Sequence, residues 1–115
     1  MRLDEAAEIA PYRTMWLITM FDVPVLTKED RRDYVRLRKG LLRAGFMQLQ
    51  FSVYARWCES EDAAKVLRKI VRGVLSPGGE VRIMTVTERQ FAKMEVFFGR
   101  KKHAAEAPPE QFTLF

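Results

Sequence analysis

The sequence predicts a single α+β domain in which two helices pack on one face of an antiparallel sheet. Its 115 residues, 48% of them hydrophobic, suffice for one compact core and would be cramped as two domains. Short apolar or alternating segments, typical of strands, are separated by two longer segments with helical apolar spacing. The order is strand, helix, one or two strands, helix, strand, strand. This order predicts a ferredoxin-like β-α-β-β-α-β sandwich with an added C-terminal strand.

The first strand and helix are predicted from an apolar run and from capping residues. Residues 15–21 (MWLITMF) are continuously apolar, which favours a strand buried on both faces. Thr27 is the predicted N-cap of a helix, and Asp30, three positions on, is favourable near the helix N-terminus. The helix is expected to stop at Gly45, which suits a left-handed C-terminal cap, although Gly40 inside it costs about 1 kcal/mol relative to Ala.

The next strand and helix follow from alternation and from helical spacing. Residues 46–56 (FMQLQFSVYAR) are predicted as a strand long enough to divide in two. Its two predicted faces are Phe51, Val53 and Ala55 against Gln50, Ser52 and Tyr54. Ser60 is the predicted cap of a second helix, whose apolar positions are Ala63, Val66, Leu67, Ile70, Val71 and Val74.

The last strands and the chain ends complete the predicted organisation. Residues 81–86 (VRIMTV) and 94–98 (MEVFF) are predicted as strands after a Ser-Pro-Gly-Gly break. We divide the chain into an N-terminal extension (1–13), the ferredoxin-like domain (14–99) and a C-terminal linker with a docking tail (100–115). The tail could dock as an edge strand on this chain, on a twin or on another protein through Phe112, Leu114 and Phe115. A frayed terminus is the alternative.

The charge distribution favours a polyanionic partner. The chain has a formal net charge of +5, but residues 14–102 carry +8 between acidic ends of −1 and −2. Clustered Lys and Arg side chains gain free energy by releasing the counterions condensed on a phosphate backbone. We therefore predict nucleic acid as a partner, with a merely solvated basic surface as the alternative.

A basic stripe on the first helix is the best candidate for phosphate contact. The side chains that fall within about 60° of one another on a helical wheel, opposite an apolar face, are Arg32, Arg36, Lys39 and Arg43. The predicted nucleic-acid-binding residues are Lys28, Arg31, Arg32, Arg36, Lys39 and Arg43. The second helix repeats the scheme with Lys65, Arg68, Lys69 and Arg72, although Glu61 can pair with Lys65. We expect binding that depends on shape and salt more than on base sequence.

Several functional classes are excluded by what the chain lacks. Cys58 and His103 are the only residues of their types, so one chain can form neither a disulfide framework nor a Cys/His zinc cluster. No Ser-His-Asp set, Cys-His pair or phosphate loop is present. An RNA recognition motif has the same element order, but its glycine-and-aromatic signature is missing. Without a membrane-length apolar run or a secretory signal pattern, we expect a cytoplasmic protein with no membrane partner.

Asp22 is the remaining candidate for chemistry. It ends the first predicted strand, two residues before Pro24. One interpretation is a turn-forming Asp that bonds its own backbone. The other is a metal ligand, because Mg²⁺ takes one or two protein carboxylates, keeps several waters and accepts phosphate oxygens. A single Asp22 carboxylate from one chain is a small ligand set for Mg²⁺. We therefore predict that any Mg²⁺ site lies at a homodimer interface that brings two Asp22 side chains together.

Three segments together resemble a known family. They are a strand ending in Phe-Asp-Val-Pro, a basic first helix, and Gly-Phe-x-x-x-Gln-Phe-Ser-Val-Tyr at residues 45–54. Over about residues 15–99 the chain resembles the Cas two family of small CRISPR-associated adaptation proteins. Thr-Glu-Arg-Gln-Phe at residues 87–91 and the apolar tail are similar to the branch found beside type II effector nucleases.

The resemblance implies a homodimer whose sheets are extended by C-terminal strands crossing between protomers. It implies a complex with two dimers of the CRISPR integrase, Cas one, that spans captured double-stranded DNA before insertion into the repeat array. In some members the aspartate matching Asp22 has been assigned as a Mg²⁺ ligand for phosphodiester cleavage, and many members are described as endoribonucleases. The chain departs from the pattern in having Phe21 where Tyr is common, Ala55 where an acidic residue is common, and an N-terminal extension.

The first functional hypothesis is therefore a non-catalytic, duplex-DNA-binding scaffold for spacer acquisition. The second is a Mg²⁺-dependent endonuclease, acting on single-stranded RNA or double-stranded DNA, with paired Asp22 side chains as its catalytic carboxylates. A third, by fold analogy, is a toxin-type ribonuclease. The scarcity of acid–base groups near Asp22 favours the first.

Overall fold

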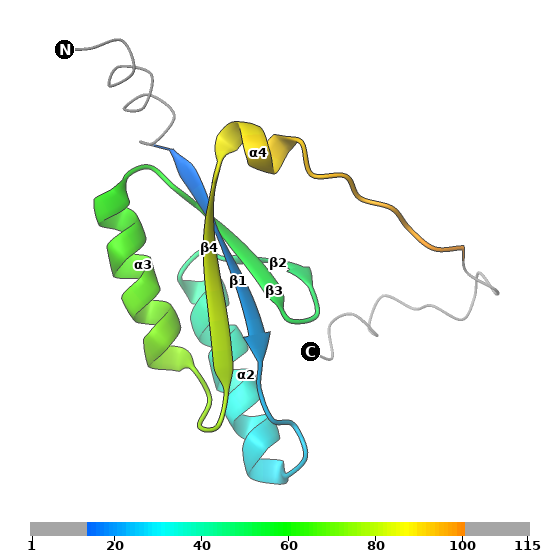
Figure 1. Cartoon of the computed structure of the whole chain (residues 1–115). Helices are drawn as coiled ribbons and strands as arrows, with labels where there is room; N and C mark the ends of the chain where they lie inside the picture. The colour runs from blue at the N-terminus through cyan, green and yellow to red at the C-terminus, as the bar shows by residue number, and fades with distance from the viewer. Residues whose placement is uncertain (1–13, 101–115) are drawn as a thin grey trace.

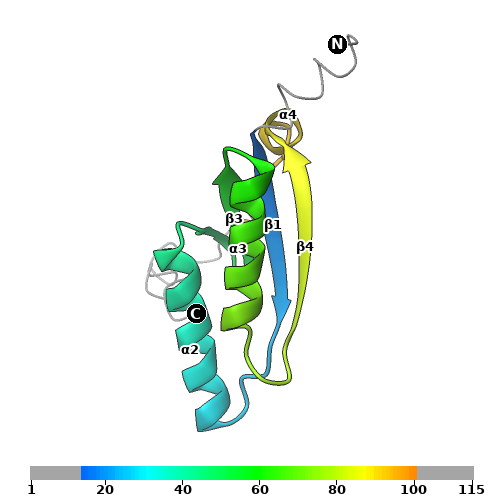
Figure 2. The ribbon, with the colours of Figure 1, turned by 90° about the vertical axis from the view of Figure 1, so that its left-hand side faces the viewer.

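Two helices cover one face of a four-stranded antiparallel sheet in the computed structural model, which describes residues 14–100 (Figures 1 and 2). The elements are β1 Met15–Asp22, α2 Lys28–Arg43, β2 Met47–Gln50, β3 Val53–Cys58, α3 Glu61–Val74, β4 Glu80–Thr87 and α4 Glu88–Ala92. The strand order is β2-β3-β1-β4, and all neighbouring strands are antiparallel. This topology confirms the predicted ferredoxin-like sandwich.

The predicted helix caps are confirmed. The Thr27 hydroxyl accepts a hydrogen bond from the Asp30 amide at 2.9 Å, and the Asp30 carboxylate accepts one from the Thr27 amide at 3.1 Å. This reciprocal pair satisfies two donors that would otherwise be unpaired at the helix start. Gly45 follows α2 with φ +89, a left-handed conformation that glycine adopts at little cost. The Ser60 hydroxyl likewise accepts from the Ala63 amide at the start of α3, at 3.1 Å.

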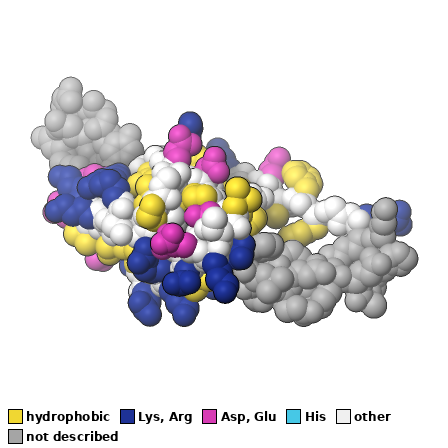
Figure 3. Space-filling view, turned by 90° about the horizontal axis from the view of Figure 1, so that it is seen from below, with side chains coloured by type: hydrophobic (Ala, Val, Ile, Leu, Met, Phe, Trp, Pro, Cys, Tyr) yellow, Lys and Arg dark blue, Asp and Glu magenta, His cyan; other side chains and the backbone are white. Residues whose placement is uncertain are grey.

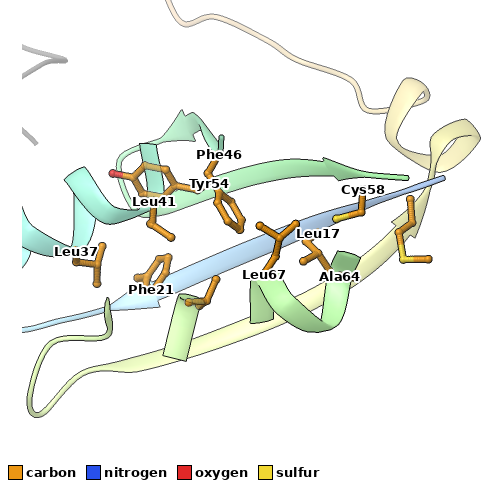
Figure 4. Packing of buried hydrophobic residues seen from close by; sticks show 11 residues of the cluster. Leu17, Phe21, Leu37, Leu41, Phe46, Tyr54, Cys58, Ala64 and Leu67 are labelled. Carbon is orange, nitrogen blue, oxygen red and sulfur yellow. The ribbon is translucent and has the colours of Figure 1, made fainter. Parts of the chain in front are cut away.

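The core lies between the sheet and the two helices (Figure 4). Tyr54 of β3 is fully buried in it, whereas the Phe51 side chain is 46% exposed. The prediction that placed Phe51 with Val53 and Ala55 on one strand face is therefore wrong for Phe51. It lies in the turn between β2 and β3, next to a register shift in their pairing, so the alternation does not run through it.

The strand predicted at residues 94–98 does not form. The chain instead enters α4, whose start Thr87 and Gln90 fix by a reciprocal capping box. Residues 94–100 then run without regular structure, and the Phe98 side chain is 91% exposed (Figure 1). A strand requires a neighbour for its backbone groups, and this segment has left the sheet of its own chain.

The N-terminal extension and the docking residues Phe112, Leu114 and Phe115 lie outside the described residues. None of the helices within residues 14–100 has the length and apolar character needed to cross a membrane.

Gly40 marks a close approach between α2 and α3. A Cβ atom at Gly40 would lie 2.6 Å from Val74 Cγ1, well inside van der Waals contact. Gly40→Ala is therefore expected to lower the free energy of unfolding by about 1–2 kcal/mol, because overpacking outweighs the gain in helix propensity. Urea denaturation measures this effect.

The matched control for that prediction is the double variant Gly40→Ala with Val74→Ala, which removes the overlapping methyl group. The two substitutions are expected to be less destabilising together than the sum of the single changes. A Gly40→Ala protein as stable as the parent would show that the helices can move apart at no cost.

Candidate nucleic-acid interface

All six predicted nucleic-acid-binding side chains lie exposed on α2, which begins with Lys28 and ends with Arg43. They face outward because Tyr34, Leu37 and Leu41 bury the opposite side of the helix against the sheet. In the space-filling view, Lys and Arg side chains gather along the lower and left sides, over the helix layer (Figure 3). The side chains of the basic stripe are thus exposed together on one face of α2, as the helical wheel predicted.

The members of the stripe differ in how free they are. Arg36 pairs with Asp33 at 3.0 Å, and Arg31 Nη1 donates to the Leu26 carbonyl at 2.9 Å. Arg31 therefore secures the turn before α2 and is less available to a ligand. Within residues 14–100, no ion pair is present for the other four, which are Lys28, Arg32, Lys39 and Arg43. These four are the side chains best placed to exchange counterions for phosphates.

The α3 side chains form a weaker surface than their spacing indicates. Arg68 turns toward the sheet, where it pairs with Glu61 at 2.8 Å and donates to Thr85 Oγ1 at 3.2 Å. The hydrogen bond from Arg68 holds the pKa of Glu61 below its usual value. Glu61 therefore pairs with Arg68, and not with Lys65 as the sequence suggested. The exposed basic side chains left on α3 are Lys65, Lys69 and Arg72.

The face of the sheet opposite the helices, here called the open face, is largely apolar. Strand register places the following side chains on it: Trp16, Ile18, Met20, Val53, Ala55, Trp57, Met84 and Val86. Met84, midway along the edge strand β4, is 49% exposed. In the described part of the chain only α4 lies against this face, at one end. An apolar sheet face of this kind is typical of an interaction surface.

A clasp formed by α4 closes that end of the open face, and sequence reasoning missed it. The two Glu88 carboxylate oxygens accept hydrogen bonds from Trp16 Nε1 and Trp57 Nε1, each at 3.0 Å. The Phe91 ring stacks on the Trp16 ring, with centroids 3.9 Å apart. The available signal was the Thr-Glu-Arg-Gln-Phe segment at residues 87–91. The clasp anchors the start of the exposed segment that follows α4.

Asp22 lies exposed at the last position of β1, on the open-face side by its alternation with Met20. Its neighbour across the ladder is Glu80, which pairs with Arg82 at 3.6 Å. Among residues 14–100, no three His, Cys, Asp or Glu side chains come together as a metal site. One chain therefore fits Mg²⁺ only as part of a site that a second chain would complete.

Comparisons with known proteins place the chain in one family. The family model described as CRISPR associated protein Cas2 matches residues 15–94. Three similar proteins each bear the name CRISPR-associated endoribonuclease Cas2. That of Flavobacterium psychrophilum is 38% identical over 90% of both chains. That of Paracidovorax avenae is 41% identical over 90% of this chain and 96% of its own, and that of Parvibaculum lavamentivorans is 43% identical over 88% and 100%.

Proposed function

Because this chain belongs to the CRISPR associated protein Cas2 family, we propose that it is a homodimeric, duplex-DNA-binding scaffold for CRISPR adaptation that acts with the CRISPR integrase. The observation that carries the proposal is the exposed basic stripe along α2, in which Arg32, Lys39 and Arg43 form no ion pair within residues 14–100. A helix of 16 residues is about 24 Å long, enough to follow several successive phosphates of a duplex.

The homodimer is supported by the open face. A second copy, with its own apolar sheet face, would cover Met84, whose side chain is 49% exposed to water in the single chain. The exposed segment after α4 carries Met94, Val96, Phe97 and Phe98, which need a partner for the same reason. The clasp directs this segment away from its own sheet, so a strand that pairs with the second copy is the proposed role of residues 94–98.

The scaffold role is tested by assembling the chain, the integrase and a short duplex DNA. We expect one defined species in light scattering whose mass exceeds that of every two-component mixture. The mass should contain two copies of this chain. A mixture in which the integrase and the duplex assemble equally well without this chain would contradict the proposal.

A second candidate is the Mg²⁺-dependent endonuclease, favoured by the exposure of Asp22 at the rim of the open face and by the names of the relatives. Paired Asp22 side chains from the two copies would hold the ion. When bound, Mg²⁺ would supply a Lewis acid and a more acidic water for phosphodiester hydrolysis. Among the charged residues of the described strands, register brings only Glu80 and Arg82 beside Asp22 at this end of the open face, so the scaffold remains our first proposal.

Asp22→Ala is expected to lower Mg²⁺-dependent cleavage by at least about 100-fold while leaving spacer acquisition intact. The reason is that a scaffold needs the duplex surface and the dimer, but not the metal. Cleavage is measured on labelled single-stranded RNA and double-stranded DNA, and acquisition is measured as growth of the repeat array in cells.

Glu80→Ala is the matched control, because it removes a carboxylate at the same end of the sheet. Cleavage should survive this change. Loss of acquisition in an Asp22→Ala protein that folds and dimerises would count against the scaffold, and unchanged cleavage in that variant would count against the nuclease.

A further inference from the structure

The outer edge of β4 has no neighbouring strand in the described part of the chain. The strand order is β2-β3-β1-β4, so β4 pairs with β1 on one side only. An edge of 8 residues exposes a row of backbone N–H and C=O groups that can pair with another strand. The other edge strand, β2, has 4 residues and a register shift, which makes its edge shorter and less regular. The β4 edge is therefore the better acceptor for an added strand.

The same chain carries a segment suited to that edge. Residues 94–98 (MEVFF) are rich in residues that favour strands, and the Phe97 side chain is 84% exposed. The connection between β4 and this segment, residues 88–93, has the ordinary length of about four to six residues. Its length alone would allow the segment to fold back on its own β4 as a hairpin. In the structure it does not do so.

The clasp explains why the hairpin does not form. The Glu88 carboxylate binds Trp16 of β1 and Trp57 of β3, which lie directly opposite each other in the strand register. These two bonds draw α4 across the open face, inward over β1 and toward β3, which is the direction away from the β4 edge. Beyond α4 the chain accordingly leaves the sheet on the side of β2 and β3 (Figure 1).

The position of α4 depends on the clasp. A helix of 5 residues is too short to be stable through its own hydrogen bonds. Each Glu88 carboxylate oxygen accepts one indole N–H, and hydrogen bonds to an ionised acceptor are stronger than those between neutral groups. The Phe91 ring adds its stacking contact on Trp16. Glu88 and Phe91 therefore decide on which side of the sheet the chain emerges.

We propose that the clasp makes strand pairing intermolecular, because it holds residues 94–98 away from their own β4 edge and presents them to the β4 edge of a second copy. By two-fold symmetry, each copy gives one strand and receives one. When the clasp is opened, the segment returns to its own β4 and the dimer is weakened. This inference rests on the proposed homodimer and adds the edge that receives the strand and the residues that position it.

The test is chemical cross-linking between the segment and β4. The full chain carries Thr85→Cys and Glu95→Cys, both at exposed positions, and is treated with a short bis-maleimide. The natural Cys58 is buried and does not compete. Isotope-labelled and unlabelled chains are mixed and allowed to exchange before cross-linking. With the clasp intact, mass spectrometry should find linked peptides that combine a labelled and an unlabelled chain.

Glu88→Ala in the same background opens the clasp. We expect the links to shift from between chains to within one chain, and the dimer dissociation constant to rise about 10-fold. Phe91→Ala should act in the same direction. Arg89→Ala is the matched control, because it removes a charge from an exposed residue of α4 and leaves both tryptophan hydrogen bonds in place. It should behave as the parent.

The gain of links within one chain separates a positioning role from a merely structural one. If Glu88→Ala only loosened α4, both kinds of link would decrease, and the inference would be overturned. Links between chains that persist at the parent level in both clasp variants would also overturn it, while the homodimer would stand. A dimeric parent without links between chains would show that the copies meet without exchanging strands. A monomeric parent would contradict the proposed homodimer itself, and the inference with it.

Discussion

Replacing Arg32 and Arg36 together by Glu is expected to weaken duplex binding by about 100-fold at 0.1 M salt. Both side chains are exposed on the outer face of α2, and Arg32 has no ion pair within residues 14–100. The change removes two cations and adds two anions per chain, so the salt slope should also fall in magnitude by about 1.8 per chain. Fluorescence anisotropy with a short labelled duplex, at several salt concentrations, measures both quantities.

The comparison variant is Lys69→Glu with Arg72→Glu, which makes the same change of charge on α3. We expect a smaller loss of affinity, because Arg68 and Glu61 neutralise part of that helix by pairing with each other. An equal or larger loss of affinity in the α3 variant would show that the duplex contacts both helices. Full-strength binding by the α2 variant would contradict the stripe as the DNA surface.

Met84→Asp is expected to convert the proposed dimer into folded monomers. The side chain lies midway along the edge strand β4 on the open face and is 49% exposed in the single chain, so the substitution should leave the fold intact. In a dimer built on this face it would bury a charge without a partner, which costs several kcal/mol and is enough to weaken association by about 1000-fold or more. Light scattering gives the mass, and circular dichroism checks the fold.

Val66→Asp on α3 is the matched control, since Val66 is 58% exposed on the helix side of the molecule. It should remain dimeric. A Met84→Asp protein with the mass of the parent dimer would show that the two copies meet elsewhere. Binding of DNA by the monomeric variant should also weaken, because one duplex would contact one stripe in place of two.

The elements that were predicted correctly depend on residues close together in the chain. Thr27 and Asp30 form a capping box across three positions, and Gly45 ends α2 by its own conformational freedom. The stripe is equally local, because the helical repeat alone decides that Arg32 and Lys39 share a face. Resemblance over the segment that ends at Tyr54 indicated the family, which the family model then confirmed.

The predictions that were wrong concern segments whose structure depends on a one-residue shift in strand register or on a contact with a residue far away in the chain. Alternation assigns Phe51 to a strand face, but a register shift between β2 and β3 places it in their turn. The strand expected at residues 94–98 rests on composition, which cannot supply a neighbouring edge. In the chain, the contact of Glu88 with Trp16, 72 residues away, secures α4 against the open face instead.

The sequence by itself determined the order of the elements, their caps, the basic stripe and the family. The tertiary structure decided which of those cations are engaged in ion pairs and which face of the sheet is left open. The physical reason is the distance along the chain over which the deciding interactions act. Caps and helical faces follow from interactions within a few residues, whereas pairing, burial and charge neutralisation depend on which distant strands and helices become neighbours.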